Sequence, residues 1–167
     1  METSASPVLR LDLKRADLGE LISDDALLRS CGLIRSLGDQ GLKTVLAVAV
    51  GRRFRDGVAI FTRLDPGDSL LLVMKGEARL IGREGGESVE PGGARKGDVF
   101  GEGGVLEGLK VRETTAVAVG ELDVMEVPRQ TARTLADALP ELVAYLSEIR
   151  ARRKSASAEM ADFLNRW

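Results

Sequence analysis

The sequence contains no histidine and only one cysteine, Cys31. Histidine is the commonest general acid or base near neutral pH and a frequent metal ligand, so its absence removes the easiest route to a hydrolase or a metalloenzyme. A single cysteine forms no intrachain disulfide and has no companion at a metal-ligand spacing. We therefore expect no enzymatic activity, no catalytic residue and no metal site, and we interpret Cys31 as a small buried hydrophobic side chain.

Long hydrophobic runs and an excess of positive charge are also lacking. No apolar stretch approaches the ~20 residues of a membrane span, and residues 1–7 lack the basic and hydrophobic parts of a signal peptide. The formal net charge is −2 and the isoelectric point is about 5.4, so no global basic field attracts nucleic acid. We expect a cytoplasmic protein that neither spans a membrane nor binds nucleic acid.

The rest of the composition is that of an ordinary folded domain. A chain of 167 residues, 44% hydrophobic and 30% charged, is long enough to bury a core in one domain with attached helices. Aliphatic residues recur at three- and four-residue steps over residues 17–28 and 33–50, which predicts two helices. Asp24 is expected to cap a helix start, and Gly32 is expected to end that helix.

Between residues 52 and 127 the pattern changes to short strands separated by turn residues, which is typical of an antiparallel barrel or sandwich. Tight turns are expected at Lys75-Gly76-Glu77 and at Gly120-Glu121, and a polar hairpin tip is expected at 82–93. Strands are predicted at 52–54, 59–62, 69–75, 77–82, 93–95, 112–119 and 121–128.

The C-terminal part predicts helices again. Leucine and other aliphatic residues recur on one face over residues 131–153, with a break at Leu139-Pro140 because proline suits the first turn of a new helix. Residues 155–157 are expected to form a small linker or helix start, followed by a last amphipathic turn or two over 158–167. A basic cluster near the end of this run is interpreted as complementing the dipole at a helix end; it consists of Arg150, Arg152, Arg153 and Lys154.

Residues 96–119 combine glycines with two opposite charges. Glu102 and Arg112 stand ten positions apart, and four glycines lie between Phe100 and Arg112. Glycines let the backbone approach a ligand closely and adopt positive φ, so that N–H groups converge on phosphate oxygens. Arginine offers the paired donors that phosphate geometry favours, and a glutamate accepts a hydrogen bond from a sugar hydroxyl. The segment therefore predicts a sugar-phosphate pocket.

This segment resembles the phosphate-binding cassette of the cyclic nucleotide-binding domain family, found in catabolite-activator-type regulators, kinase regulatory subunits and gated channels. The resemblance rests on Phe100-Gly101-Glu102, on Arg112 ten positions after the glutamate, and on the threonines that follow. It covers roughly residues 33–153. The structural glycines of the family have counterparts at Gly57, Gly67, Gly76, Gly97 and Gly101.

The resemblance implies a mainly β fold with flanking helices. The expected architecture is an antiparallel double-stranded β-helix, a jelly-roll-like barrel, with α-helices at its N- and C-terminal sides. The chain then divides into a partly helical N-terminal extension (1–32), the cyclic nucleotide-binding-like domain with its C-terminal helices (33–153) and a helical tail (154–167).

The resemblance also implies a set of ligand-binding residues. Arg112 is expected to pair with the phosphate and Glu102 with the ribose, while Gly103 and Gly104 donate backbone N–H groups. Two other readings remain open, because Glu102 could only cap a short helix and Arg112 could be a solvated strand-edge arginine. The full predicted set is Gly101, Glu102, Gly103, Gly104, Arg112, Glu113, Thr114 and Thr115.

Glu113 departs from the family pattern, in which a small residue follows the arginine. A carboxylate that pointed inward would repel an anionic ligand and compete for Arg112, whereas strand alternation would turn it away. A possible lid is Tyr145 or Trp167, either of which could stack on a purine, although an aromatic residue on a helix more often belongs to a core or an interface.

Two functions are therefore expected as alternatives. In the first, the chain is a regulatory module without chemistry of its own that binds a cyclic purine nucleotide, cAMP or cGMP. Binding moves its C-terminal helices against the barrel, and the output passes to an unknown downstream protein or to the second copy in a homodimer that these helices form. With fourteen residues after Arg153, no DNA-reading domain is expected. In the second, Glu113 pairs with Arg112, no nucleotide binds, and the fold is a protein-protein interaction scaffold.

Overall fold

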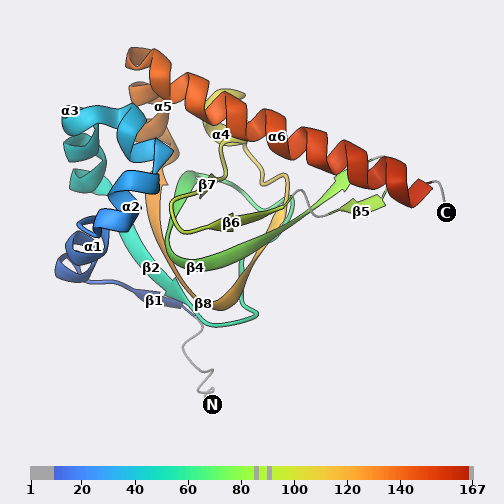
Figure 1. Ribbon diagram of the computed structural model, residues 1–167, viewed down its shortest axis with the longest axis horizontal. Coiled ribbons are helices and arrows are strands. Elements are labelled where there is room, and N and C mark those ends of the chain that lie inside the picture. Colours follow the sequence, from blue (N-terminus) through green and yellow to red (C-terminus); the bar gives the residue numbers. More distant parts are fainter. Residues whose placement is uncertain (1–9, 85–86, 90–91, 166–167) are drawn as a thin grey trace.

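The computed structural model describes residues 10–84, 87–89 and 92–165, in which a curved sheet is flanked by helices at one end and crossed by a long helix (Figure 1). The helices are α1 (Arg15–Ile22), α2 (Asp25–Ser30), α3 (Gly32–Val48), α4 (Gly103–Leu106), α5 (Arg129–Ala138) and α6 (Pro140–Asn165). The strands are β1 (Arg10–Asp12), β2 (Val50–Phe54), β3 (Ala59–Phe61), β4 (Ser69–Glu84), β5 (Glu87–Val89), β6 (Gly93–Arg95), β7 (Val99–Phe100) and β8 (Thr115–Pro128).

All strand pairs in the described residues are antiparallel. The strand order is β1-β2-β8-β4-β5, with β3 paired to β8 and both β6 and β7 paired to β4. The prediction of an antiparallel sheet with flanking helices is therefore confirmed.

Two predicted hairpin turns are wrong, because β4 and β8 each run through the glycine that was read as a turn. The two strands pair along almost their whole length, from Ser69 opposite Pro128 to Ile81 opposite Thr115. Their register shifts around Lys75 and Glu77. Gly76 and Gly120 both have positive φ, but they bend paired strands instead of reversing them.

Two buried faces explain the hydrophobic run at the start of β4. Leu70, Leu72 and Met74 belong to the core cluster shared with the helices, whereas Leu71 and Val73 belong to the cluster enclosed by the sheet. Successive side chains of a strand point to opposite faces, so a strand covered on both sides needs apolar residues at every position. The sheet thus carries one core inside its curve and another beneath the helices.

The N-terminal helices divide differently from the prediction. Asp24 caps α2 as expected, its carboxylate accepting hydrogen bonds from the N–H groups of Ala26 and Leu27. Gly32 does not end a helix but begins α3, where a Cβ atom would lie only 2.2 Å from the ring of Tyr145. Close approach to that ring, not chain termination, explains this glycine.

The C-terminal helices keep the predicted break at Leu139-Pro140, where α5 ends and α6 begins. The linker expected at 155–157 is not observed, because α6 continues without interruption to Asn165, and Ser157 is buried within it. Trp167 and parts of the predicted tip at 82–93 lie outside the described residues. Over the part of the chain that is described, no helix has both the length and the apolar character to cross a membrane.

Candidate functional site

The cassette begins where β7 ends, and two glycines there make a slot for Arg112. Gly101 has a φ of +85°, and a Cβ atom on it would lie 2.7 Å from Nη1 of Arg112. A Cβ atom on Gly67 would lie 2.9 Å from Cδ of the same arginine. Real Cβ atoms do not approach so closely, so only glycine at both positions lets Arg112 occupy this place.

Arg112 is a buried guanidinium held by uncharged partners. Its Nη1 donates to the carbonyl oxygen of Ser69 at 2.8 Å, its Nη2 donates to Oγ of Ser69 at 2.9 Å, and the guanidinium lies 4.3 Å from the ring centroid of Phe61. Among the described residues no carboxylate forms an ion pair with Arg112, and its buried Nε has no hydrogen-bond partner. Burial lowers the pKa of Arg112. The negative charge of Asp68 acts in the opposite direction but does not outweigh burial.

A hollow opens beside this guanidinium and gathers most of the predicted ligand-binding residues. Gly101, Glu102, Gly103, Gly104, Arg112, Glu113 and Thr114 all line it. Thr115 does not line it; its Oγ1 accepts a hydrogen bond from the N–H of Arg63, which links β8 to the segment after β3. Residues 112–114 precede β8, so the strand predicted from 112 begins three residues later.

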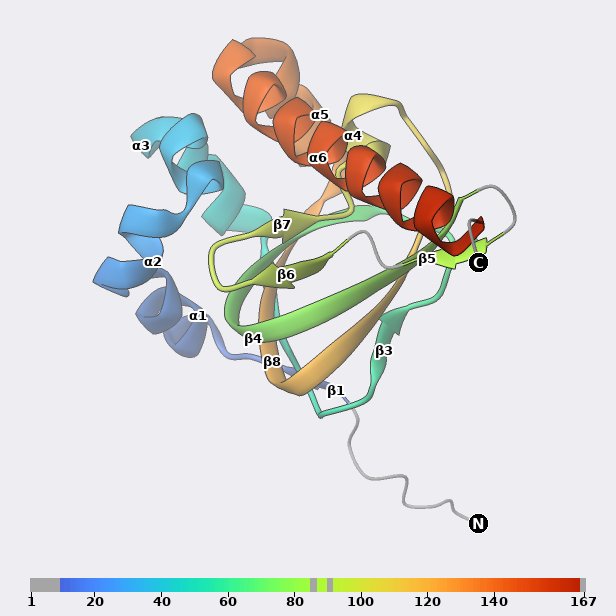
Figure 2. The ribbon, with the colours of Figure 1, turned by 45° about the vertical axis from the view of Figure 1, so that its right-hand side comes forward.

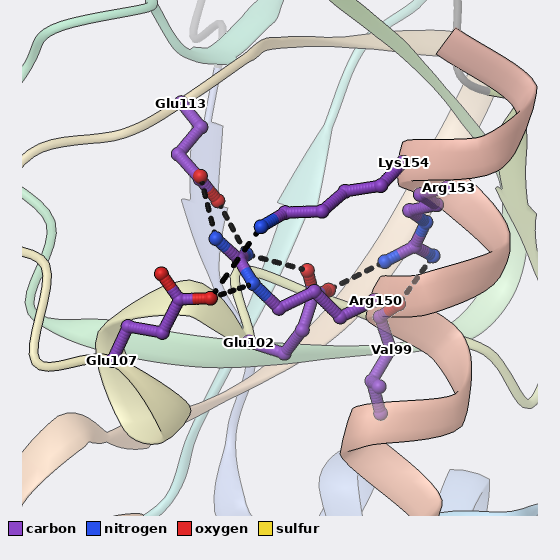
Figure 3. Close-up of polar contacts among 7 residues, drawn as sticks. All are labelled: Val99, Glu102, Glu107, Glu113, Arg150, Arg153 and Lys154. Atoms are coloured by element: carbon purple, nitrogen blue, oxygen red, sulfur yellow. Dashed lines mark hydrogen bonds and ion pairs between the residues drawn. The ribbon is translucent and has the colours of Figure 1, made fainter. Parts of the chain in front are cut away.

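Glu113 turns to Arg150 of helix α6 (Figure 3), and in the part of the chain that the structure describes no ion pair joins it to Arg112. Its two carboxylate oxygens accept hydrogen bonds from Nη1 and Nη2 of Arg150 at 2.6 and 2.7 Å. This geometry contradicts the alternative in which Glu113 blocks Arg112. Strand alternation does not explain this orientation, because residues 112–114 are not in a strand. The ion pair with Arg150 of α6 explains it.

Arg150 also reaches two other carboxylates of the cassette. Its Nε donates to Glu107 at 2.6 Å, and its Nη1 lies 3.6 Å from Oε2 of Glu102. Hydrogen bonding to Glu113 raises the pKa of Arg150, and the hydrogen bond from Arg150 lowers the pKa of Glu107. We name the group of Arg150, Glu102, Glu107 and Glu113 the α6 clamp.

Glu102 is also held by a second arginine of α6. Nη1 of Arg153 donates to Oε1 of Glu102 at 2.6 Å, and its Nη2 donates to the carbonyl oxygen of Val99 at 2.6 Å. From the sequence, Arg150 and Arg153 were interpreted only as complements of a helix dipole, so their contact with Glu102 and Glu113 was missed. Their spacing of three, which places both on one face of a helix, was the available signal.

Arg129 is a further residue of the hollow that sequence reasoning missed. It is the first residue of α5, and its Nη1 donates to the carbonyl oxygen of Leu109 at 2.9 Å. Tyr145, the predicted lid, does not line the hollow; it packs on Gly32, and burial raises its pKa to about 12. In this arrangement Tyr145 belongs to the contact between α3 and α6.

Comparison with known proteins agrees with this architecture. Residues 51–138, just over half of the chain, match the family model described as the cyclic nucleotide-binding domain. No curated protein is significantly similar in sequence.

The solved structures similar to this chain include a PKA regulatory domain, a catabolite activator protein and a sensor domain. The regulatory domain of Toxoplasma gondii PKA, co-crystallised with cAMP, is 26% identical with a TM-score of 0.63, over 74% of this chain and 47% of that one. The catabolite activator protein of Thermus thermophilus is 27% identical with a TM-score of 0.62, over 80% and 63%. This chain thus spans about half to two thirds of the length of these two proteins. The sensor domain of DNR from Pseudomonas aeruginosa, 17% identical over 80% of this chain and 90% of its own with a TM-score of 0.65, shares the fold.

Proposed function

This chain belongs to the cyclic nucleotide-binding domain family, and on that premise we propose that it is a regulatory module, without chemistry of its own, that binds a cyclic purine nucleotide, cAMP or cGMP. The bound nucleotide shifts the balance between arrangements of α5 and α6. The output then passes to a downstream protein or to a second copy of the chain.

The burial of Arg112 among uncharged partners is the observation that supports this proposal. A buried cation without a counter-ion is costly, and an anion that enters the site removes that cost. The cyclic phosphate is such an anion, and the Nε of Arg112 is a donor that has no acceptor within the described ranges of the chain. The burial that lowers the pKa of Arg112 therefore favours the binding of a phosphate.

The other predicted contacts surround this guanidinium. Gly103 and Gly104 open α4, where the first N–H groups of a helix have no acceptor within it. Glu102 has carboxylate capacity beyond its two arginine contacts, because an ionised carboxylate accepts about four hydrogen bonds, and a ribose hydroxyl can use the remainder. Phe61, Leu80 and Leu109 supply an apolar wall for a purine.

The far half of α6 supports an output through protein contact. Met160, Phe163 and Leu164 are exposed and follow the three- and four-residue spacing of one helix face. A second copy of the chain, joined through this face, would cover them. Light scattering of the purified protein, compared with the Phe163→Glu variant, tests this homodimer: the variant should be monomeric, and a wild-type monomer would contradict the idea.

Calorimetric titration with cAMP and cGMP tests nucleotide binding. A ligand at a hundred times its dissociation constant stabilises the folded state by about 2.7 kcal/mol, which raises the melting temperature detectably. Arg112→Ala should abolish binding, because it removes the guanidinium that is seated in the glycine slot. Arg95→Ala, a change at an exposed arginine of β6, is the matched control and should bind as the wild type does. Absence of binding by the wild type would leave the scaffold function.

A further inference from the structure

We infer that Arg150 makes the pocket acceptable to an anion by neutralising Glu113, so that docking of α6 is a condition for ligand binding. The inference rests on the proposed function, because it concerns the same site. It assigns Arg150 as a positioning residue of α6 that acts on the ligand through Glu113.

The first support is the placement of the α6 clamp. Glu102 and Glu113 line the hollow beside Arg112, whereas Arg150 lies behind them, outside the lining of that hollow. Arg150 is only 7% exposed, although it lies on a helix that crosses the surface of the sheet (Figure 2). A buried arginine held by three carboxylates of the cassette joins α6 directly to the rim of the pocket.

The second support is the local balance of charge. The cassette presents three carboxylates, at Glu102, Glu107 and Glu113, and α6 presents Arg150, Arg153 and Lys154 against them. With α6 docked, the two sets cancel. With α6 displaced, the carboxylates of Glu102 and Glu113 face an anion in the hollow without compensation and repel it.

Glycine at position 103 is the third support. A Cβ atom there would lie 2.6 Å from Oε2 of Glu113 and 2.8 Å from Nη1 of Arg150. The bidentate pair therefore rests directly against the first residue of α4, which itself lines the hollow. Any side chain at 103 would have to displace part of the pair.

The coupling has a definite sign. If docked α6 favours an anion in the pocket, then an anion in the pocket favours docked α6 by the same factor, because binding linkage is reciprocal. The ligand thus strengthens the attachment of residues 150–165 to the sheet. This differs from a helix that must leave to admit the ligand.

Five variants test the role of Arg150 by calorimetry with cAMP. Arg150→Gln should weaken cAMP binding about tenfold, because it leaves Glu113 charged and unpaired beside the phosphate. Glu113→Gln alone should bind within about threefold of the wild type, and the double variant should recover to about that level. Arg152→Gln, at an exposed arginine of the same helix, should change nothing. Arg150→Lys, which keeps the charge, should lose less than Arg150→Gln.

Orthophosphate distinguishes failure of this inference from failure of the proposed function. In isotope-labelled protein, phosphate in the hollow shifts the Nε–H resonance of Arg112, and Arg150→Gln should abolish the shift while the double variant restores it. Wild-type protein that binds phosphate but no cyclic nucleotide would overturn only the proposed function.

Two results with the variants would overturn the role of Arg150 itself. One is equal cAMP or phosphate binding by Arg150→Gln and the wild type. The other is a double variant that stays as weak as Arg150→Gln, which would show that Arg150 acts through packing and not through the charge of Glu113. The inferred role of Arg150 would also be wrong if neither cAMP nor phosphate shifted the Arg112 resonance of the wild-type protein, because the hollow would then bind no anion.

Discussion

Arg112 and Arg150 are buried to nearly the same extent, at 8% and 7% exposure, but their surroundings are opposite. Arg112 lies on an aromatic ring and donates to a single serine. Arg150 is surrounded by three carboxylates. Burial lowers the pKa of the first, and hydrogen bonding to Glu113 raises that of the second.

This difference distinguishes a cation suited to binding a ligand from a cation that stabilises the fold. A buried cation without a counter-ion favours an external anion, whereas a buried cation whose donors are all engaged holds two parts of the fold together. The two arrangements meet at neighbouring residues of the cassette, because Glu113 follows Arg112 in the chain but is bound by Arg150 of α6. The following changes sharpen the contrast, from the largest expected effect to the smallest.

Neutralising each arginine in turn should separate stability from binding. Arg150→Gln should lower the free energy of unfolding by about 2 kcal/mol, less than for a fully buried pair because its partners are partly exposed. Arg112→Gln should lower it by less than about 1 kcal/mol, because the loss of two hydrogen bonds is offset by removal of an uncompensated buried charge. Urea unfolding measures both. Equal losses would erase the distinction between the two sites.

Gly101→Ala should disturb the Arg112 slot. The added Cβ atom meets Nη1 of Arg112 at 2.7 Å, and a φ of +85° strains any residue other than glycine, so we expect a loss of about 1–2 kcal/mol and tenfold weaker cAMP binding. Gly57→Ala is the matched control, since Gly57 has a φ of +79° but no atom within 4 Å of an added Cβ. A control as weak in binding as Gly101→Ala would assign the effect to backbone strain alone.

Gly103→Ala should loosen the α6 clamp with a smaller effect. An added Cβ atom would meet the ends of three side chains, those of Glu113, Arg150 and Leu109, and alanine favours the helix by about 1 kcal/mol, so the net change in stability should stay below about 1 kcal/mol. Hydrogen exchange in α6 should nevertheless become faster. Gly104→Ala gains the same helix propensity near Arg129 instead, and exchange in α6 should not change.

Acid should weaken the clamp while leaving the Arg112 slot intact. The hydrogen bond from Arg150, with help from Lys154, lowers the pKa of Glu107 from 4.5, so this carboxylate stabilises the folded state above pH 4.5 and ceases to do so as the pH falls through its lowered value. The urea midpoint should fall over that range, and Glu107→Gln should reduce the slope. An unchanged slope in the variant would assign acid sensitivity to other carboxylates, such as Asp24 beside Lys96.

Glycine illustrates how far sequence reasoning reached. Positive φ was predictable at Gly76, Gly101 and Gly120, but a positive φ serves a tight turn and a bulge equally well. At Gly76 an added Cβ atom would lie 2.3 Å from the carbonyl oxygen of Glu121, a contact with another strand that no local pattern reveals. The turns were therefore wrong although the glycines were correctly singled out.

The sequence by itself determined the antiparallel sheet with its flanking helices, the break before α6, and the presence of Arg112 at the end of a glycine-rich segment. These features were predictable because alternation, capping and proline act between near neighbours. Only the tertiary structure decided which arginine Glu113 binds. Arg150 lies 37 residues further along the chain, and an ion pair between such distant residues depends on how a whole helix docks, not on the residues beside either partner.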